Sequence, residues 1–140
     1  MAFDWMGYLT LAESLSKAHA DEAKLRAAIS RAYYAAYVTA RRYWESMGYR
    51  LQDSVGSHVQ VSRAYERRNP VSEPDKLKAH VGNALRQMHE YRVSADYDDE
   101  FAYSGIVQVA ESTVILARKT IANVEKLKAD PKASPKDRPF

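Results

Sequence analysis

Residues 21–47 read DEAKLRAAISRAYYAAYVTARRYWESM, and this stretch decides the fold. Apolar side chains recur in it at steps of three and four, which is the spacing of one face of an α-helix. Asp21 can cap the start of this helix, and Gly48 follows its last periodic residue as a stop signal. Bulky aromatic residues widen the apolar face, so we expect the helix to contact more than one neighbour. The periodic positions are Leu25, Ile29, Ala32, Ala36, Ala40, Tyr43 and Met47.

The sequence on both sides of this stretch predicts further helices and no strand. Asp4 can cap a first helix, and the short turn around His19 makes that helix an antiparallel neighbour of the long one. No segment alternates polar and apolar residues over more than a few positions, which argues against strands. The further helices are predicted at about 4–15, at 57–68, from Ser72 or Asp75 to about Arg92 or just beyond, and at 99–128. The expected architecture is all-α, an up-and-down bundle of four to five helices.

Length and composition narrow the class of protein. The chain has 140 residues, of which 46% are hydrophobic and 28% charged, and it has no cysteine. This mixture is typical of one globular domain and excludes disulfide scaffolds and thiolate metal sites. We expect a single helical domain over residues 1–128 and a basic, proline-containing, disordered tail over residues 129–140. No apolar run is long enough to span a membrane and the N-terminus lacks a signal peptide's basic segment, so a cytoplasmic protein is the default expectation.

Generic catalytic signatures are absent from the sequence. It contains no glycine-rich phosphate loop, no nucleophile elbow and no metal-ligand motif. The four histidines are scattered, and His80 and His89 would lie on opposite sides of one helix, so we expect neither a metal nor another cofactor. The acidic run 96–100 offers carboxylates of the kind that bind Mg²⁺. Aspartates just before a helix more often cap it, and we favour capping of the fifth helix.

Several arginines lie inside the predicted helices, where their side chains can be held in place for phosphate contacts. A solvated helix face is the alternative for each of them. We expect Arg92, at the end of the fourth helix, to face a cleft and to contribute little to packing. The other arginines of this group are Arg41, Arg42, Arg63, Arg67, Arg68 and Arg86.

Two local patterns stand out from the rest of the chain. Residues 30–37 read SRAYYAAY, and residues 92–98 read RVSADYD at the end of the fourth predicted helix. In this order they resemble the HEPN superfamily, the small helical domains of prokaryotic toxin–antitoxin and defence systems. Its short members carry an SRAYYAA helix and a later segment in which an arginine precedes ADYD. The resemblance covers nearly the whole predicted bundle, residues 4–128.

The resemblance implies a particular chemistry. Nuclease-active HEPN domains are metal-independent ribonucleases whose motif arginine is followed, four to six residues later, by a histidine. Arg92 matches the motif arginine, and Tyr97 stands at the motif histidine. A tyrosine, with a reference pKa of about 10, is a poor general base near neutral pH, so the motif is degenerate. His89 shares a helix face with Arg92 and can substitute for the missing histidine.

The resemblance also implies partners and a ligand. Two HEPN copies meet to form one composite site, so we expect a homodimer, and some members pair with a small nucleotidyltransferase. The ligand expected is RNA or a nucleotide. We assign catalysis to Arg92, Tyr97 and His89, and binding to Arg31, Tyr34, Arg86 and Asp96.

Three functions remain open from the sequence. The one we favour is a HEPN-like protein of toxin–antitoxin or defence type that binds RNA or a nucleotide with a degenerate nuclease motif. The first alternative is an active, metal-independent HEPN ribonuclease. The second is a non-catalytic helical interaction module, whose last helix repeats every seven residues and packs against another subunit. In that case Arg92 is dispensable.

Overall fold

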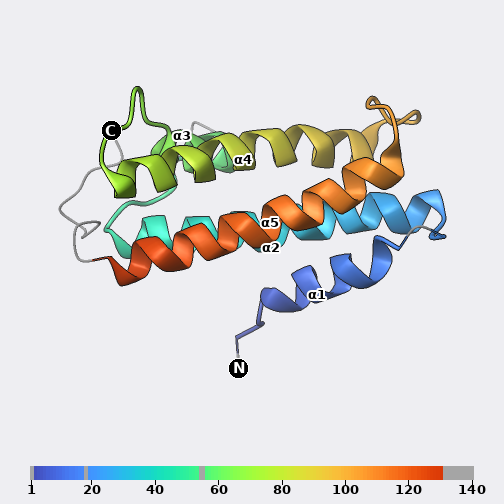
Figure 1. The fold of residues 1–140 in the computed structure, drawn as a ribbon, viewed down its shortest axis with the longest axis horizontal. Coiled ribbons are helices and arrows are strands. Elements are labelled where there is room, and N and C mark those ends of the chain that lie inside the picture. Colours follow the sequence, from blue (N-terminus) through green and yellow to red (C-terminus); the bar gives the residue numbers. More distant parts are fainter. Residues whose placement is uncertain (1, 18, 54–55, 131–140) are drawn as a thin grey trace.

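The computed structural model describes residues 2–17, 19–53 and 56–130, and the secondary structure in this part of the chain is entirely helical. The helices are α1 (Met6–Leu15), α2 (Glu22–Ser46), α3 (Ser57–Tyr65), α4 (Glu73–Tyr97) and α5 (Ile106–Ala129). α2 contacts each of the other four, whereas α3 packs mainly on α4. α1, α2, α4 and α5 alternate in direction along the long axis (Figure 1). The structure confirms an all-α, up-and-down bundle.

The central helix α2 begins and ends as its sequence predicts. The carboxylate of Asp21 accepts a hydrogen bond from the Lys24 amide at 2.9 Å, which satisfies one of the free N–H groups of the first turn. After the last turn, Gly48 has a φ of 94°, a left-handed conformation that favours glycine. Between these ends, Ala28, Ala32 and Ala36 are fully buried. Small side chains at these contacts let the neighbouring helices approach closely.

The junction between α4 and α5 differs from the prediction. α4 continues to Tyr97, so Arg92 lies inside the helix, and α5 begins at Ile106 instead of near Asp99. The residue that precedes α5 is Gly105, with a φ of 70° and no side-chain cap. The interpretation of the acidic run 96–100 as the cap of the fifth helix was therefore wrong.

Arg26 of α2 provides the physical reason for the longer α4. Its guanidinium donates hydrogen bonds to the carbonyl oxygens of Ala95 at 3.2 Å, of Asp98, and of Asp99 at 3.2 Å. The last carbonyls of a helix have no partner within the helix, so an external donor stabilises the terminal turn. In the same place, the hydroxyl of Ser94 accepts a hydrogen bond from the Ala102 amide at 2.9 Å. These contacts hold the chain that follows α4 against the helix end.

A glycine sets the distance between α3 and α4. A Cβ on Gly82 would lie 3.1 Å from the backbone oxygen of Ser62 and 3.1 Å from the backbone carbon of Tyr65. These distances are shorter than most Cβ contacts, so a side chain at position 82 would require the backbone of α3 to move away by a few tenths of an ångström. On its other side, α3 is anchored by the Tyr65 hydroxyl, which donates to the Ala40 carbonyl of α2 at 2.6 Å. α3 is thereby fixed between α2 and α4, and it ends at Tyr65 rather than near Arg68.

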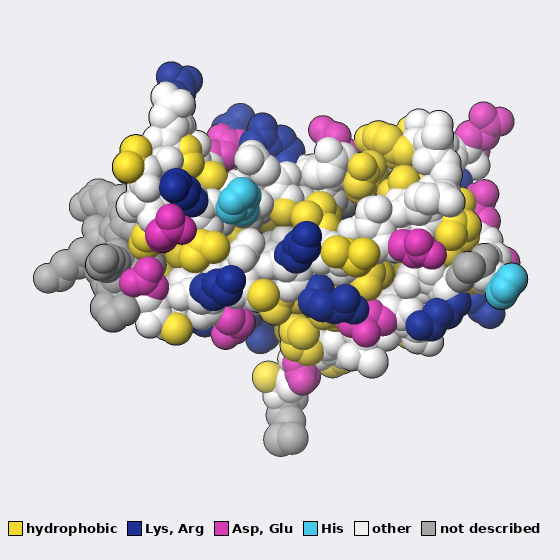
Figure 2. Space-filling model, in the orientation of Figure 1, with side chains coloured by type: hydrophobic (Ala, Val, Ile, Leu, Met, Phe, Trp, Pro, Cys, Tyr) yellow, Lys and Arg dark blue, Asp and Glu magenta, His cyan; other side chains and the backbone are white. Residues whose placement is uncertain are grey.

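The remaining sequence-based expectations concern the chain end and the membrane. α5 ends at Ala129, and the expected disordered tail lies almost wholly outside the described residues. Among the helices of the described part, none is both long and apolar enough to cross a membrane. Figure 2 shows the α4–α5 face, where basic and acidic side chains are interspersed with hydrophobic ones.

Candidate functional site

Side chains from α2, α3 and α4 meet in one polar and aromatic group, which we name the Arg92 cluster. It is built on helical spacing: His89 and Arg92 are three residues apart on α4, and Tyr33 and Tyr37 are four apart on α2. α3 adds His58 from its first turn. The members of the Arg92 cluster are Tyr33, Tyr34, Tyr37, His58, His89 and Arg92.

Arg92 is a buried cation, with 6% of its surface exposed. Its guanidinium carbon lies 5.7 Å from the ring centroid of Tyr33 and 5.4 Å from that of Tyr34, both within cation–π range. Its ion pair is with Asp96, at a long N–O distance of 3.5 Å. The Nε–H of Arg92 has no hydrogen-bond acceptor among the described residues. A buried arginine normally uses its donors more fully, so Arg92 has hydrogen-bonding capacity left for a ligand.

Asp96 joins the two sequence patterns that carry the HEPN resemblance. Its carboxylate accepts a hydrogen bond from the Ser30 hydroxyl of α2 at 3.2 Å, with the same oxygen that faces Arg92. Ser30 begins the SRAYYAAY segment, and Asp96 belongs to the RVSADYD segment. The two segments are therefore neighbours in space as well as recognisable in sequence.

Two histidines from different helices form a close pair of tilted rings beside Arg92. The ring centroids of His58 and His89 are 4.9 Å apart. Tyr33 shares a hydrogen bond of 2.6 Å between its hydroxyl and Nδ1 of His58. Burial raises the pKa of Tyr33 far above its usual range, so this hydroxyl keeps its proton. When Tyr33 donates to Nδ1, the N–H of neutral His58 lies on Nε2; when the Tyr33 oxygen accepts from Nδ1–H, the lone pair of Nε2 is free.

Both histidines of the pair favour the neutral form. Burial, together with the positive charges of His89, Arg92 and Arg41, lowers the pKa of His58 to about 4. Burial and Arg92 lower the pKa of His89 as well. A neutral imidazole can accept a proton, so the pair can supply acid–base chemistry that the exposed phenol of Tyr97 does not.

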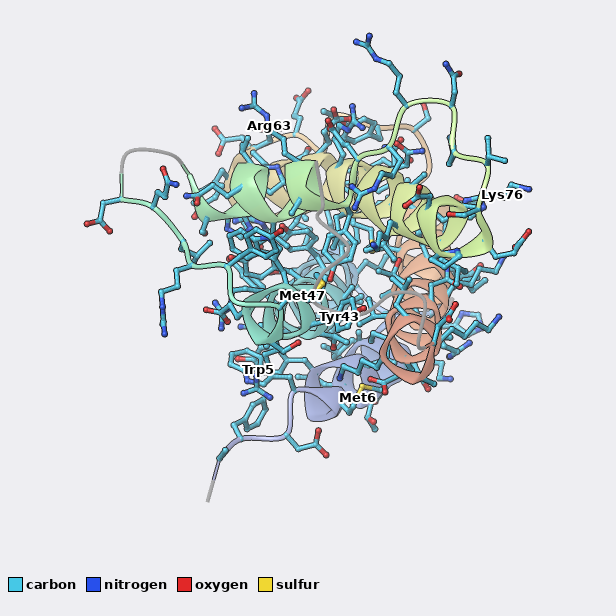
Figure 3. All side chains as sticks on the ribbon, turned by 90° about the vertical axis from the view of Figure 1, so that its left-hand side faces the viewer. Trp5, Met6, Tyr43, Met47, Arg63 and Lys76 are labelled. Carbon is cyan, nitrogen blue, oxygen red and sulfur yellow. The ribbon has the colours of Figure 1, made fainter. Side chains whose placement is uncertain are left out.

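A cavity of about 250 Å³ opens beside the histidine pair, between α3 and α4. Its polar lining comprises both histidines, Ser62, Arg63, Glu66 and Arg86. Arg86 is partly neutralised there by an ion pair with Glu66 at 3.2 Å. Arg63 projects from α3 at the end of the bundle that faces the viewer in Figure 3. The cavity therefore gives a ligand access to the histidines from a basic rim.

The structure brings together most of the residues to which the sequence assigned a site role. Tyr34, His89 and Arg92 lie in the Arg92 cluster, Asp96 contacts it, and Arg86 lines the adjoining cavity. Tyr97 is 73% exposed at the end of α4, with its ring centroid 6.0 Å from the Arg92 guanidinium carbon.

Arg31 is placed elsewhere. Its guanidinium carbon lies 4.9 Å from the ring centroid of Tyr8, on the α1 side of α2. Ser30 faces Asp96 while Arg31, the next residue, points about 100° away around the helix.

Two features of the site depart from the sequence analysis. Arg92 is buried within α4, so the expectation of a helix-end side chain that contributes little to packing was wrong. His58, Tyr33 and Tyr37 were not assigned to the site. The tyrosines carry a signal, because they share one face of α2 at a spacing of four. His58 carries none, since only tertiary packing places α3 beside α4.

Among the described residues, no group of three or more histidine, aspartate or glutamate side chains is arranged to hold a metal ion. Comparison with known proteins adds no assignment: no family model matches the chain, and neither characterised proteins nor solved structures gave a match.

Proposed function

We propose that this chain is a HEPN-like protein that binds RNA or a nucleotide at the Arg92 cluster. The observation that carries the proposal is the buried Arg92, held between tyrosine rings with a donor that no described residue accepts. A phosphate group supplies both the negative charge and the acceptor oxygens that such an arginine lacks.

The surroundings of Arg92 favour a nucleotide over a simple anion. Tyr34 is partly exposed next to Arg92, and Tyr97 is mostly exposed at the end of α4. Aromatic faces of this kind stack on nucleic-acid bases, and the stacking tolerates any base. Arg63 and Arg86 at the rim of the neighbouring cavity add positive charge for further phosphates.

A binding experiment tests this proposal directly. We expect labelled single-stranded RNA to bind the wild-type protein and to bind Arg92→Gln at least about tenfold more weakly, because a charge-assisted hydrogen bond contributes about 1.5–3 kcal/mol. AMP and inorganic phosphate compete in the same anisotropy assay. The matched control is Arg118→Gln, which removes an exposed arginine paired with Glu13 on the α1–α5 side. Equal affinities of the wild type and Arg92→Gln for every ligand would contradict the proposal.

The close pair of histidines favours a second candidate function, metal-independent cleavage of RNA. In the tautomer of His58 whose Nδ1–H donates to the Tyr33 oxygen, Nε2 has a free lone pair. Neutral His58 then accepts the proton of a ribose 2′-hydroxyl at Nε2, and the 2′-oxygen attacks the neighbouring phosphorus. The bond from phosphorus to the 5′-oxygen breaks as protonated His89 donates a proton to that oxygen. Arg92 offsets the negative charge that develops on the phosphate. The products are a 2′,3′-cyclic phosphate and a free 5′-hydroxyl.

This second function makes a separate prediction, because it needs one histidine neutral and the other protonated. The pKa of both groups is lowered, so cleavage in EDTA should be fastest below pH 6.5 and slow towards pH 8. His58→Gln and His89→Gln should each abolish it, whereas His80→Gln, an exposed histidine on the same helix as His89, should retain it. RNA that is bound but stays intact from pH 5 to 8 leaves only the binding function.

The HEPN resemblance extends the proposal to assembly. We propose a homodimer in which two Arg92 clusters share one ligand, with a small nucleotidyltransferase as a further partner. The exposed Val93 and Tyr97 support a contact surface at the end of α4. Sedimentation of the wild type and of Val93→Glu tests this, with a dimer expected for the wild type and a monomer for the variant. A monomeric wild type at 100 μM, on the order of a weak complex's Kd, removes this part of the proposal.

A further inference from the structure

A second pocket lies at the C-terminal end of α2, beyond the part of this helix that contributes tyrosines to the Arg92 cluster. It is formed by the end of α2, the segment 48–52 and α3, with a volume of about 570 Å³. Its lining is mixed in character and contains no carboxylate. The lining includes Trp44, Tyr49, Arg50, Gln60 and Arg63.

The wall of this pocket is aromatic and held in place. The rings of Trp44 and Tyr49 are parallel, with an interplanar angle of 1° and centroids 5.8 Å apart. The backbone N–H of Gln52 donates to the Gln60 side-chain oxygen at 2.8 Å, and the Gln60 amide group donates back to the Gln52 carbonyl at 2.7 Å. This reciprocal pair fastens the segment after α2 to α3, so the aromatic wall is formed before any ligand arrives.

Trp44 brings a hydrogen-bond donor that is not used within the protein. The side chain is 6% exposed, and its Nε1–H has no acceptor among the described residues. Buried indole N–H groups usually find a partner. Trp44 also lines the pocket, so a ligand atom with a lone pair can provide that partner.

The unused donor at Trp44 belongs to a row of such groups. Within the described part of the chain, four buried side-chain polar atoms lack a hydrogen-bond partner: Nε of Arg92, the hydroxyl of Tyr37, Nε of Arg41 and Nε1 of Trp44. Tyr37, Arg41 and Trp44 follow one another along one face of α2. Arg41 has an ion-pair contact with Glu45 at 3.5 Å, but this contact is not a hydrogen bond. All four groups can donate, so the row needs acceptors.

This row connects the Arg92 cluster with the second pocket. Tyr34, which contacts Arg92, and Trp44 are ten residues apart on α2, or about 15 Å at the rise of an α-helix. That span is about four steps of a stacked nucleic-acid strand at 3.4 Å each. Arg63 lines both the second pocket and the cavity at the histidine pair. A ligand that extends from the cavity at the histidine pair to the second pocket therefore passes the guanidinium group of Arg63.

We propose that the Trp44 pocket is a base-binding subsite for a single-stranded RNA whose phosphate is held at Arg92. A base of the strand packs against the Trp44–Tyr49 wall and offers an acceptor to the indole N–H, and an intervening phosphate pairs with Arg63. This inference rests on the proposed function and sharpens it, because it makes the ligand a strand of several nucleotides rather than a mononucleotide.

Affinity as a function of strand length tests the inference. Oligouridylates of one, two, four, six and eight nucleotides are compared by competition in the anisotropy assay. We expect the affinity to rise about tenfold or more between two and six nucleotides and then to level off. Arg63→Gln and Trp44→Phe should remove most of this rise, whereas Arg92→Gln should weaken binding at every length. Arg63 is exposed on α3, so its substitution remains informative even where Trp44→Phe impairs folding.

Fluorescence provides an independent reading of the same subsite, because the chain has two tryptophans. Trp5→Phe leaves Trp44 as the sole reporter, and Trp44→Phe leaves Trp5. Figure 3 shows Trp5 beside α1, on the opposite side of the bundle from Arg63. We expect hexauridylate to quench Trp44 and not Trp5, and inorganic phosphate to quench neither.

The outcomes separate the two proposals. Binding that is independent of length, with no response from Trp44, overturns the base-binding subsite and leaves the proposed function standing. Absence of binding by any uridylate, by the labelled single-stranded RNA and by AMP overturns both. A rise in affinity with length that Arg63→Gln and Trp44→Phe leave intact also overturns the subsite, because the added nucleotides then bind elsewhere.

Discussion

At the scale of single residues, the site contains polar groups whose charge or hydrogen-bond donors are only partly paired with other described residues. Arg92 is a buried cation whose ion-pair partner Asp96 is 3.5 Å away, and its Nε–H has no acceptor among the described residues. The His58–His89 pair places two imidazoles close together beside this cation, which disfavours a proton on either. Such arrangements lower the free energy of unfolding, and proteins retain them mainly where binding or catalysis needs them.

Replacement of Arg92 by a neutral side chain of similar length should therefore stabilise the fold. We expect Arg92→Met to raise the free energy of unfolding by about 1 kcal/mol, because a desolvated charge is replaced by an apolar chain. Asp96 keeps its hydrogen bond from Ser30 and has a partly exposed side chain, so its loss of a partner costs little. Urea denaturation at pH 7 measures the change, with Arg118→Met as the surface control. A loss of more than 1 kcal/mol, on the scale of an ordinary destabilising substitution, would make Arg92 a structural residue.

The histidine pair should make stability depend on pH in a defined direction. The pKa of His58 is lowered from 6.5 to about 4 in the folded protein, so the unfolded chain binds more protons between these values. The contribution of His58 to the free energy of unfolding is then fully present above pH 6.5 and is lost as the pH falls towards 4. The His58 side chain is partly exposed, and we expect a loss of about 1–2 kcal/mol, less than the full shift implies. Urea denaturation of His58→Gln should show a smaller loss over this range, and an unchanged pH profile in this variant would contradict the assignment.

At the scale of elements, the site depends on how closely α3 approaches α4. α3 has nine residues, too few to be stable without tertiary contacts, and it carries His58 and Arg63. Gly82 lets its backbone approach α4, and the hydrogen bond from Tyr65 to Ala40 fixes it on α2. The position of α3 thus decides whether His58 meets His89 and whether Arg63 stands between the two cavities.

A methyl group at position 82 tests this dependence. We expect Gly82→Ala to lower the free energy of unfolding by about 1–3 kcal/mol, because its Cβ makes unusually close contacts with backbone atoms at the end of α3, which would have to shift. RNA affinity should fall as well, since His58 and Arg63 move with α3. The matched control is Gly7→Ala in α1, where the nearest atom is Phe3 Cζ at 3.7 Å. That change should stabilise the protein by up to about 1 kcal/mol, as alanine does inside a helix. Equal thermal stability of the two variants would contradict the close approach.

At the scale of the whole molecule, the bundle is organised around the alanine-lined faces of α2. Ala36 is fully buried in the core, so Ala36→Leu should lower the free energy of unfolding by about 1–3 kcal/mol through overpacking. Thermal or urea denaturation measures this, with Ala23→Leu on the exposed part of the first turn of α2 as the control. A neutral result at position 36 would mean that the helices around α2 can move apart without loss.

The parts of the fold and site that could be predicted from the sequence are those that depend on interactions between residues close together in the chain. The limits of α2 are encoded locally, in Asp21 and Gly48, and were predicted correctly. The end of α4 was missed because its carbonyls are satisfied by Arg26, which is about seventy residues away in the sequence. His58 was missed for the same reason, since nothing near it in sequence points to His89. Local periodicity predicts helices well, whereas contacts between helices decide their ends and the composition of the site.

The hydrogen bonds from Arg26 to carbonyls at the end of α4 have a consequence for the order of folding. The last turn of α4 carries Asp96, and its carbonyls gain their donor only after the first turns of α2 have docked. We therefore expect the Arg92–Asp96–Ser30 contact to be among the last parts of the bundle to assemble and the first to open. Amide hydrogen exchange near Asp98 should then be faster than in the middle of α4, although the two belong to one continuous stretch of chain. A ligand that bridges α2 and α4 at this point would slow that exchange by closing the end of the bundle.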